Sequence, residues 1–202
     1  MGNQWNERFG AEQYVYGEEP NEFIRSQAHQ LQNHKKIAAF AEGEGRNAVY
    51  LASEGHEVTA YDYALNGLRK TEDLADRNGV KVRTEQKDLI NDEVPKADFD
   101  AAIMVFGHFD KKDQKTVFDK LLSCVKEGGV LMMEVYSEDQ VRYKTGGPKT
   151  VNMLYHPGDL LKWTEGYKVL HFFYGEKERK EGELHTGLGH VVQLILQKEK
   201  VK

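Results

Sequence analysis

Short apolar runs alternate with helical patterns along most of this chain, and the alternation restricts the fold more than any other feature. Strands are expected at 37–41, 57–61, 80–84, 101–106 and 130–135, and helices between them at 47–52, 64–75 and 117–125. Strands that alternate with helices at this spacing form a parallel sheet covered on both faces. The sequence therefore predicts an α/β fold with a doubly wound, mostly parallel sheet.

The last third of the sequence follows a different pattern. A short helix is expected at 157–163, and two β-rich runs at 169–174 and 191–196 flank a polar stretch. Pairing of these runs as an antiparallel hairpin at the sheet edge brings the expected sheet to seven strands. The irregular stretch 137–152, which contains Gly146-Gly147-Pro148, is the candidate lid or substrate loop.

The length of the chain suits one domain. Its 202 residues, 39% apolar and 30% charged, are enough for one well-buried core. We expect a single domain over 1–202, in which an N-terminal cover and helix at 1–34 precede an α/β core at 35–202. The cover begins with an aromatic segment, and Pro20 opens its helix.

Charge and composition exclude several classes of protein. The net charge of -5 argues against a nucleic-acid partner. The only cysteine, Cys124, cannot form an internal disulfide, no apolar run approaches the roughly 20 residues of a membrane span, and the N-terminus lacks the pattern of a signal peptide. The eight histidines are dispersed, so no metal site is predicted. We expect a cytoplasmic protein without a membrane partner; the oligomeric state stays open.

A glycine pair follows the first expected strand and precedes a helix. Gly43 and Gly45 allow a sharp turn and the close approach of a ligand, as a nucleotide-binding loop requires. The neighbouring Glu42 and Glu44 would repel a pyrophosphate, whereas a sulfonium cofactor carries a positive charge and an amino group that suit carboxylates. Packing alone also explains many glycine pairs at such turns.

Ligands of an open parallel sheet bind beyond the carboxyl ends of its strands. Asp62 ends the second strand, where a carboxylate can accept hydrogen bonds from ribose hydroxyls, and Asp88-Leu89 follow the third strand with a carboxylate and an apolar neighbour for a base. Phe106 and His108 follow the fourth. Either aspartate alone could be a helix or turn cap, and His108 could be a plain loop residue; the serial order behind the glycine turn favours a nucleoside site.

Several motifs in order and spacing support a family resemblance. The chain resembles the class I S-adenosylmethionine-dependent methyltransferases, in particular the small bacterial proteins similar to the tellurite-resistance methyltransferase and, more distantly, thiopurine methyltransferases. The matching stretches are residues 5–9, 14–17, 42–47, 58–62 and 128–130, with the late run 181–187 similar to the family's edge hairpin. The resemblance implies the Rossmann-like methyltransferase fold and S-adenosylmethionine as cofactor.

The resemblance also assigns candidate cofactor-binding residues. Gly43 and Gly45 would line the methionine part, Asp62 would hold the ribose, and Asp88 with Leu89 would frame the adenine. The full expected set is Tyr16, Ala41, Glu42, Gly43, Gly45, Asn47, Asp62, Tyr63, Asp88, Leu89 and Phe106. Ala39 and Ala41 stand where the family has an acidic residue and a glycine, and we expect Glu42 to replace the missing carboxylate.

The expected reaction is in-line methyl transfer to a small-molecule acceptor. A general base is needed only when the acceptor must lose a proton, so a sulfur, selenium or tellurium anion needs none. His108 and His185 are the candidate catalytic residues, and Arg142 with Tyr143 on the candidate lid could orient an anionic acceptor. The identity of the acceptor is not fixed by the sequence.

Two alternatives remain open at this level. A nicotinamide-dependent oxidoreductase is one, because Gly43, Gly45 and Ala48 also satisfy the G-x-G-x-x-A fingerprint and Asp62 lies near its acidic position. The flanking glutamates and the lack of a substantial second domain count against it. The other is a non-catalytic nucleoside-binding sensor or assembly module, which the alanines at 39 and 41 would suit.

Overall fold

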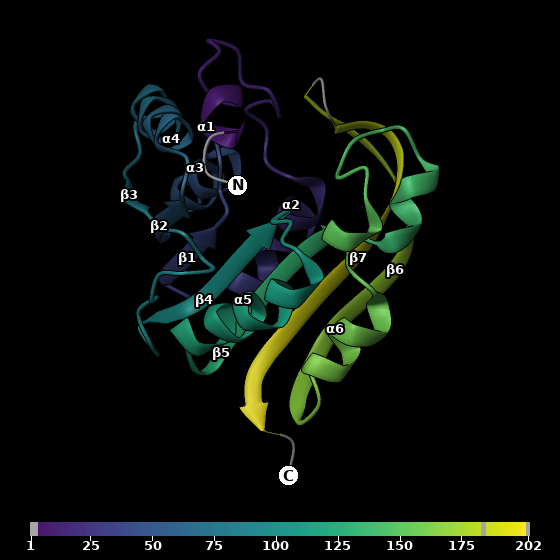
Figure 1. The fold of residues 1–202 in the computed structure, drawn as a ribbon. Helices are drawn as coiled ribbons and strands as arrows, with labels where there is room; N and C mark the ends of the chain where they lie inside the picture. Colours follow the sequence, from purple (N-terminus) through teal and green to yellow (C-terminus); the bar gives the residue numbers. More distant parts are fainter. Residues whose placement is uncertain (1–3, 183–184, 201–202) are drawn as a thin grey trace.

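The computed structural model describes residues 4–182 and 185–200. Among these residues a single mixed sheet of seven strands has the order β3-β2-β1-β4-β5-β7-β6 (Figure 1). The first five strands are parallel, β7 is antiparallel to β5, and β6 is antiparallel to β7. The strand bounds are β1 Lys36–Phe40, β2 Glu57–Asp62, β3 Val82–Gln86, β4 Phe99–Val105, β5 Val125–Tyr136, β6 Tyr167–Glu181 and β7 His185–Lys200. The predicted doubly wound sheet with a C-terminal antiparallel hairpin is confirmed.

Helices cover both faces of the sheet. One face packs against α2, α3, α4 and the short 3-10 helix η1, and the other packs against α5 and α6 (Figure 1). The bounds are α1 Gln4–Arg8, α2 Glu22–Gln27, η1 Ala28–Leu31, α3 Arg46–Ser53, α4 Leu65–Arg77, α5 Lys111–Cys124, η2 Glu138–Arg142, η3 Val151–Met153 and α6 Pro157–Trp163. In the described ranges no helix combines the length and the apolar character needed to cross a membrane.

The centre of the sheet explains why its strands read as continuous apolar runs. Ile37, Ala38, Ala39 and Phe40 of β1 are each 0% exposed, because neighbouring strands and helices on both faces enclose them. Burial of such side chains contributes roughly 25 cal/mol for each Å² of apolar surface removed from water. This rigid centre fixes the carboxyl ends of β1, β2 and β4, where the candidate site lies.

Three strands, β5, β6 and β7, are longer than the sequence predicts. β5 begins at Val125 and runs through Gly128 and Gly129, whereas the sequence predicts a strand only over 130–135. The polar stretch between the two late β-rich runs is itself paired, so β6 and β7 form a much longer hairpin than expected. Exposed hairpin positions tolerate polar side chains, which weakens the apolar signal of a strand without preventing backbone pairing.

The N-terminal segment lies against the carboxyl end of the sheet. α1 and the tip of the β6–β7 hairpin both rise above this end (Figure 1). The ring of Phe9 packs against the glycine turn, Trp5 stacks on Phe9 with 5.8 Å between ring centroids, and the ring of Tyr16 lies edge-on to Phe9 at 6.4 Å. The aromatic residues of the predicted cover therefore surround the candidate site.

Candidate active site

The turn after β1 has the backbone conformation expected of a ligand loop. Gly43 and Gly45 adopt positive φ angles of 63° and 89°. Ala41 also has a positive φ, 50°, which is costly for a residue with a Cβ by roughly 1–2 kcal/mol. A glycine, which the resembled family has at this position, would avoid that strain. Ala41 therefore adds backbone strain as well as a methyl group.

The two glutamates of the turn have separate hydrogen-bond partners. Oε1 of Glu42 accepts a hydrogen bond of 2.7 Å from the amide of Ala48 and so caps α3, whose N-cap residue, Gly45, has no side chain. Burial raises the pKa of Glu42 to about 7. Its role as anchor for the amino-acid end of a cofactor stays a prediction, now combined with the capping of α3.

Glu44 connects the glycine turn to the N-terminal cover. Its Oε2 accepts hydrogen bonds from the amides of Val15 and Tyr16 at 2.9 and 3.4 Å, and its Oε1 forms a 2.7 Å ion pair with Lys70. The charge of Glu44 is therefore balanced by Lys70, and its carboxylate is bound by the N-terminal segment. The predicted negative rim of the turn therefore consists of one carboxylate that caps a helix and one that joins the turn to the N-terminal segment.

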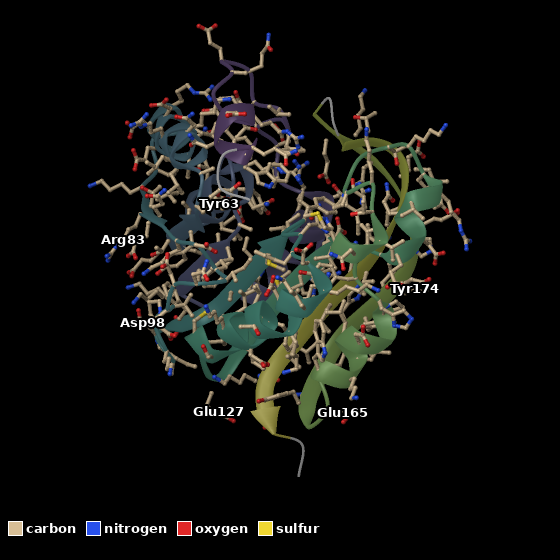
Figure 2. The ribbon with its side chains drawn as sticks, in the orientation of Figure 1. Tyr63, Arg83, Asp98, Glu127, Glu165 and Tyr174 are labelled. Carbon is tan, nitrogen blue, oxygen red and sulfur yellow. The ribbon has the colours of Figure 1, made fainter. Side chains whose placement is uncertain are left out.

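Asp62 lies where a ribose-binding carboxylate is expected, at the carboxyl end of β2. Its Oδ2 accepts a 2.8 Å hydrogen bond from the amide of Gly43, and its Oδ1 accepts one of the same length from the amide of Ala64. Asp62 is 7% exposed, and burial raises its pKa. Tyr63 follows it and lies at the same end of the molecule, away from Glu127 and Glu165 (Figure 2).

Asp88 and Leu89 occupy a turn after β3. The Asp88 carboxylate accepts hydrogen bonds from the Ile90 amide at 2.9 Å and the Asn91 side chain at 2.7 Å. Partial burial opposes ionisation, but these hydrogen bonds outweigh it and lower the pKa of Asp88. Leu89 is 4% exposed and belongs to the core cluster that also contains Tyr61. The turn geometry explains Asp88 as a cap, and its adenine role stays a prediction.

Phe106 and His108 form an aromatic group with Tyr136 beyond the end of β4. The Phe106 and Tyr136 rings stack with their centroids 4.5 Å apart, and the His108 ring lies 5.5 Å from Tyr136. Phe106 has a φ of 54°, which is rare for a bulky residue and is typical of functional sites. The sequence prediction that placed Phe106 and His108 together at this edge is consistent with these contacts.

The environment of His108 makes it a weak base. Its Nδ1 lies 3.0 Å from the carbonyl oxygen of Met153, so we assign the ring proton to Nδ1 and a free lone pair to Nε2. Burial, assisted by the positive charge of Arg179, lowers the pKa of His108 to about 4. A general base works best with a pKa near the operating pH, so His108 is poorly suited to remove a proton from an acceptor.

The other predicted residues are distributed around this centre. The backbone amide of Asn21 donates a 2.9 Å hydrogen bond to Oδ1 of Asn47 at the start of α3. The Tyr16 hydroxyl accepts a hydrogen bond of 3.0 Å from Arg8. The His185 backbone pairs with Glu181 at the hairpin tip, but its side chain lies outside the described part of the structure. Arg142 is exposed and pairs with Asp139 at 3.4 Å.

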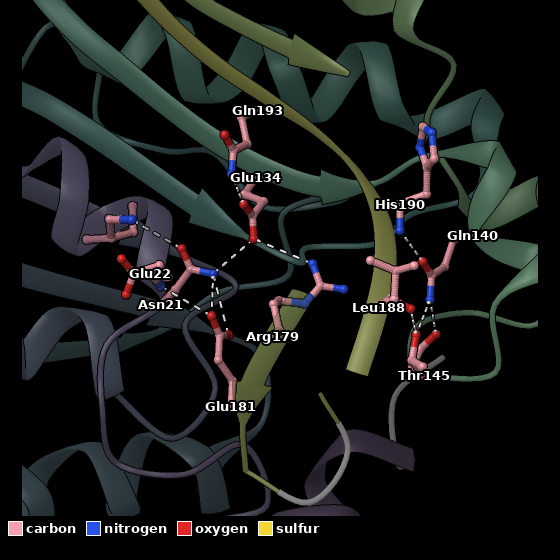
Figure 3. A network of polar contacts seen from close by, with 12 residues as sticks. Asn21, Glu22, Glu134, Gln140, Thr145, Arg179, Glu181, Leu188, His190 and Gln193 are labelled. Carbon is pink, nitrogen blue, oxygen red and sulfur yellow. Dashed lines mark hydrogen bonds and ion pairs between the residues drawn. The ribbon is translucent and has the colours of Figure 1, made fainter. Parts of the chain in front are cut away.

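A buried polar network beside the aromatic group was not identified from the sequence. Nδ2 of Asn21 donates hydrogen bonds to Oε1 of Glu134 at 2.9 Å and to Oε1 of Glu181 at 3.1 Å, and Gln193 donates to the other oxygen of Glu134 (Figure 3). Arg179 completes the group. Its residues come from segments distant in sequence, and Arg179 and Glu181 belong to a charged run that is typical of an exposed surface.

A surface groove of about 1020 Å³ lies outside this centre. It is bounded by the N-terminal segment, α4 and Gly182, and its charged lining includes Glu18, Asp73, Asp76 and Arg77. None of the predicted site residues lines it. In the ranges that the structure describes, no group of three or more histidine, cysteine or acidic side chains is arranged to hold a metal ion.

Comparison with known proteins gives a family match over just under half of the chain. Residues 37–129 match the family model described as a methyltransferase domain. The matched range contains the glycine turn, Asp62, Asp88 and Phe106. No curated protein gives a significant sequence match to this chain. Over residues 37–129 the chain is therefore similar to methyltransferase domains, as expected from the sequence.

Solved structures share the fold over nearly the whole chain. One, reported for the conversion of a disulfide bond into a thioacetal group during echinomycin biosynthesis, has a TM-score of 0.80 at 15% identity, covering 98% of this chain and 93% of its own. The N-methyltransferase NodS from Bradyrhizobium japonicum WM9, in complex with S-adenosyl-l-homocysteine, has a TM-score of 0.71 at 13% identity, covering 96% of each chain. TehB from Haemophilus influenzae has a TM-score of 0.73 at 12% identity, covering 98% of this chain and 66% of its own.

Proposed function

We propose that this chain is an S-adenosylmethionine-dependent methyltransferase that acts on a small-molecule acceptor. The observation that carries the proposal is the glycine turn after β1 with Asp62 at the end of β2, both inside the matched methyltransferase domain. The fold shared with NodS, whose structure contains S-adenosyl-l-homocysteine, supports the same cofactor.

The residues present suit the donor pattern of this cofactor. Gly43 and Gly45 provide a backbone loop for the methionine part, and the Asp62 carboxylate accepts hydrogen bonds from ribose hydroxyls. Asp88 and Leu89 offer a carboxylate and an apolar side chain for the adenine. The remaining residues that we assign to cofactor binding are Tyr16, Ala41, Glu42, Asn47, Tyr63 and Phe106.

The cofactor, when bound, supplies a methyl group activated by a sulfonium sulfur. Gly43, Gly45 and Asp62 would hold the cofactor while a lone pair of the acceptor forms the new bond to the methyl carbon, and the electron pair of the broken carbon–sulfur bond would stay on the departing sulfur. The aromatic rings around Phe106 exclude water and align the acceptor. Since His108 is a weak base, the acceptor that fits best needs no proton removed at the site, such as a thiolate or its selenium or tellurium counterpart.

Sequence motifs support a proposal for the subfamily as well. We assign the chain to the small methyltransferases similar to the tellurite-resistance and thiopurine enzymes, because the motifs at 5–9, 14–17 and 42–47 resemble theirs. A soft acceptor atom is also in keeping with the structure reported for echinomycin biosynthesis, where a disulfide becomes a thioacetal, because that structure shares this fold.

Neither alternative from the sequence is favoured. The match to a methyltransferase domain counts against a nicotinamide-dependent oxidoreductase, and a nicotinamide dinucleotide is expected to give no thermal shift where S-adenosylhomocysteine does. A non-catalytic module would bind the nucleoside cofactor without transferring its methyl group.

Single-turnover transfer of a labelled methyl group separates the enzyme from the module. The wild-type protein, mixed with labelled S-adenosylmethionine and a panel of thiols, selenols, amines and oxyanions, should methylate at least one soft anion. S-adenosylhomocysteine should appear in equal amount. If no compound of the panel is methylated although the cofactor binds, the result would contradict the enzymatic assignment and support the non-catalytic module.

A further inference from the structure

Arg179 is a buried cation with unused hydrogen-bond donors. The residue is 6% exposed, and Nε, Nη1 and Nη2 have no hydrogen-bond partner among the described residues. The one ion pair that Arg179 forms with a described residue, from Nη1 to Oε1 of Glu134, is long at 3.8 Å. A buried charge is costly unless hydrogen bonds satisfy it, so this guanidinium is suited to bind an additional anionic group.

The neighbouring carboxylates are already engaged by other groups. Both oxygens of Glu134 accept hydrogen bonds, from Asn21 and from Gln193. Glu181 accepts from Asn21 and forms a 2.7 Å ion pair with Arg46. These partners satisfy the two glutamates and leave the donors of Arg179 available (Figure 3).

The guanidinium adjoins the place where methyl transfer is proposed. Its central carbon lies 4.9 Å from the ring centroid of Phe106 and 4.6 Å from that of Tyr136. Phe106 follows β4, at the carboxyl edge of the sheet where we assign the cofactor. An anion held by Arg179 would therefore lie beside the aromatic group and within the centre proposed for the reaction.

A glycine on the partner strand makes room for the guanidinium. A Cβ added at Gly189 of β7 would lie 2.3 Å from Nη2 of Arg179 and 3.0 Å from Oε1 of Gln140. Gly189 does not have a positive φ, so its backbone does not require glycine. The missing side chain is explained by the space that Arg179 occupies.

We propose that Arg179 binds an anionic group of the methyl acceptor and thereby selects acidic acceptors over neutral ones of the same shape. This inference rests on the proposed methyltransferase function.

The test measures binding of matched thiols to the complex of the protein with S-adenosylhomocysteine. Each pair of probes consists of an acid and a neutral thiol of similar shape: mercaptoacetate with 2-mercaptoethanol, and 2-mercaptobenzoate with benzenethiol. Calorimetry measures the binding of each thiol. The wild-type complex should bind at least one acid tenfold or more tightly than its neutral partner. Arg179→Met should remove this preference, and Arg179→Lys should restore it in part.

Two further variants separate a binding role from a structural one. Gly189→Ala displaces the guanidinium without removing its charge, and it should weaken acid binding even if Arg179→Met fails to fold. Lys180→Met, which removes an exposed charge from the next position of β6, should retain the full preference. Affinity for S-adenosylhomocysteine should stay within twofold in every variant.

Each contrary result has a distinct meaning. Equal binding of acid and neutral thiols by the wild-type complex would overturn the proposal, as would an unchanged preference in Arg179→Met or Gly189→Ala. Loss of S-adenosylhomocysteine affinity in Arg179→Met would also overturn it, by assigning the guanidinium to the cofactor's own carboxylate. Failure of the wild-type protein to bind S-adenosylhomocysteine at all would instead contradict the proposed function.

Discussion

Glu42 combines a structural and a proposed functional role in one buried carboxylate. It caps α3 through the Ala48 amide, and burial raises its pKa to about 7. The same side chain lies in the turn where we assign the cofactor. The sequence singles out Glu42 as a carboxylate beside the glycine turn that can replace the acid missing at Ala39, but only the structure reveals the cap.

The raised pKa of Glu42 predicts a pH-dependent stability. Because its pKa is higher in the folded protein than the ordinary 4.5, the folded state holds the proton more tightly. The contribution of this proton to the free energy of unfolding is complete below about pH 4.5. It is lost as pH rises through about 7, and the loss is on the order of 3 kcal/mol. Glu42→Gln keeps an oxygen for the Ala48 amide and cannot ionise, so it should lack this loss.

Urea unfolding between pH 5 and 8 checks this expectation. The free energy of unfolding of Glu42→Gln, relative to wild type, should increase with pH. Glu54→Gln, which changes an exposed glutamate at the other end of α3, serves as the matched control and should follow the wild type. Parallel pH profiles for wild type and Glu42→Gln would show that Glu42 does not titrate in this range.

Some residues of the candidate site can be predicted from the sequence and others cannot. Asp62 and Phe106 could be predicted because each follows a recognisable strand of a parallel sheet, whose carboxyl ends meet at one edge. Arg179 could not, because its neighbours in sequence are Lys177, Glu178 and Lys180, all exposed. Alternation along a strand can bury one charge between exposed ones, and only pairing with β7 shows which.

At the scale of elements, Asn21 connects the N-terminal helix to the sheet and to the hairpin. Its Oδ1 caps α2 by accepting from the Ile24 amide, while its Nδ2 donates to Glu134 of β5 and Glu181 of β6. The side chain is 0% exposed. One amide thus satisfies two buried carboxylates and one helix end.

Replacing Asn21 should destabilise the fold strongly. Asn21→Ala removes a donor from two buried carboxylates, and the expected loss is on the order of 3 kcal/mol in the free energy of unfolding. Asn21→Asp keeps the cap of α2 but places a third carboxylate beside Glu134 and Glu181. It should therefore cost at least as much at pH 8 and less at pH 5.

Chemical denaturation at the two pH values measures these effects. Asn78→Ala, which removes one hydrogen bond to the Leu74 carbonyl at the end of α4, is the control and should cost about 1 kcal/mol. An Asn21→Asp protein as stable as the wild type at pH 8 would show that the two glutamates are held by other partners.

The elements themselves were predictable to different degrees. The parallel strands were found from their apolar runs, because strands buried on both faces have no polar positions to interrupt the signal. The β6–β7 hairpin was predicted too short, because its outer part carries exposed polar residues such as Glu176 and Glu178. Long-range pairing, which local patterns do not encode, determines where such strands end.

For the whole molecule, the arrangement of its parts supports one reaction centre. The glycine turn, Asp62 and Phe106 meet at the carboxyl edge, the N-terminal cover is held over this edge by Glu44, and the hairpin contributes Arg179 from the other side. A cofactor would bind between the turn and the cover, with the acceptor toward the hairpin.

Calorimetric titration with S-adenosylhomocysteine tests the central claim most directly. The wild-type protein should bind one equivalent, Asp62→Asn should bind at least tenfold more weakly because its amide accepts fewer hydrogen bonds, and Asp73→Asn on the exposed face of α4 should bind as the wild type does. Absence of binding by the wild-type protein at near-millimolar ligand would contradict the assignment of this chain as an S-adenosylmethionine-dependent methyltransferase.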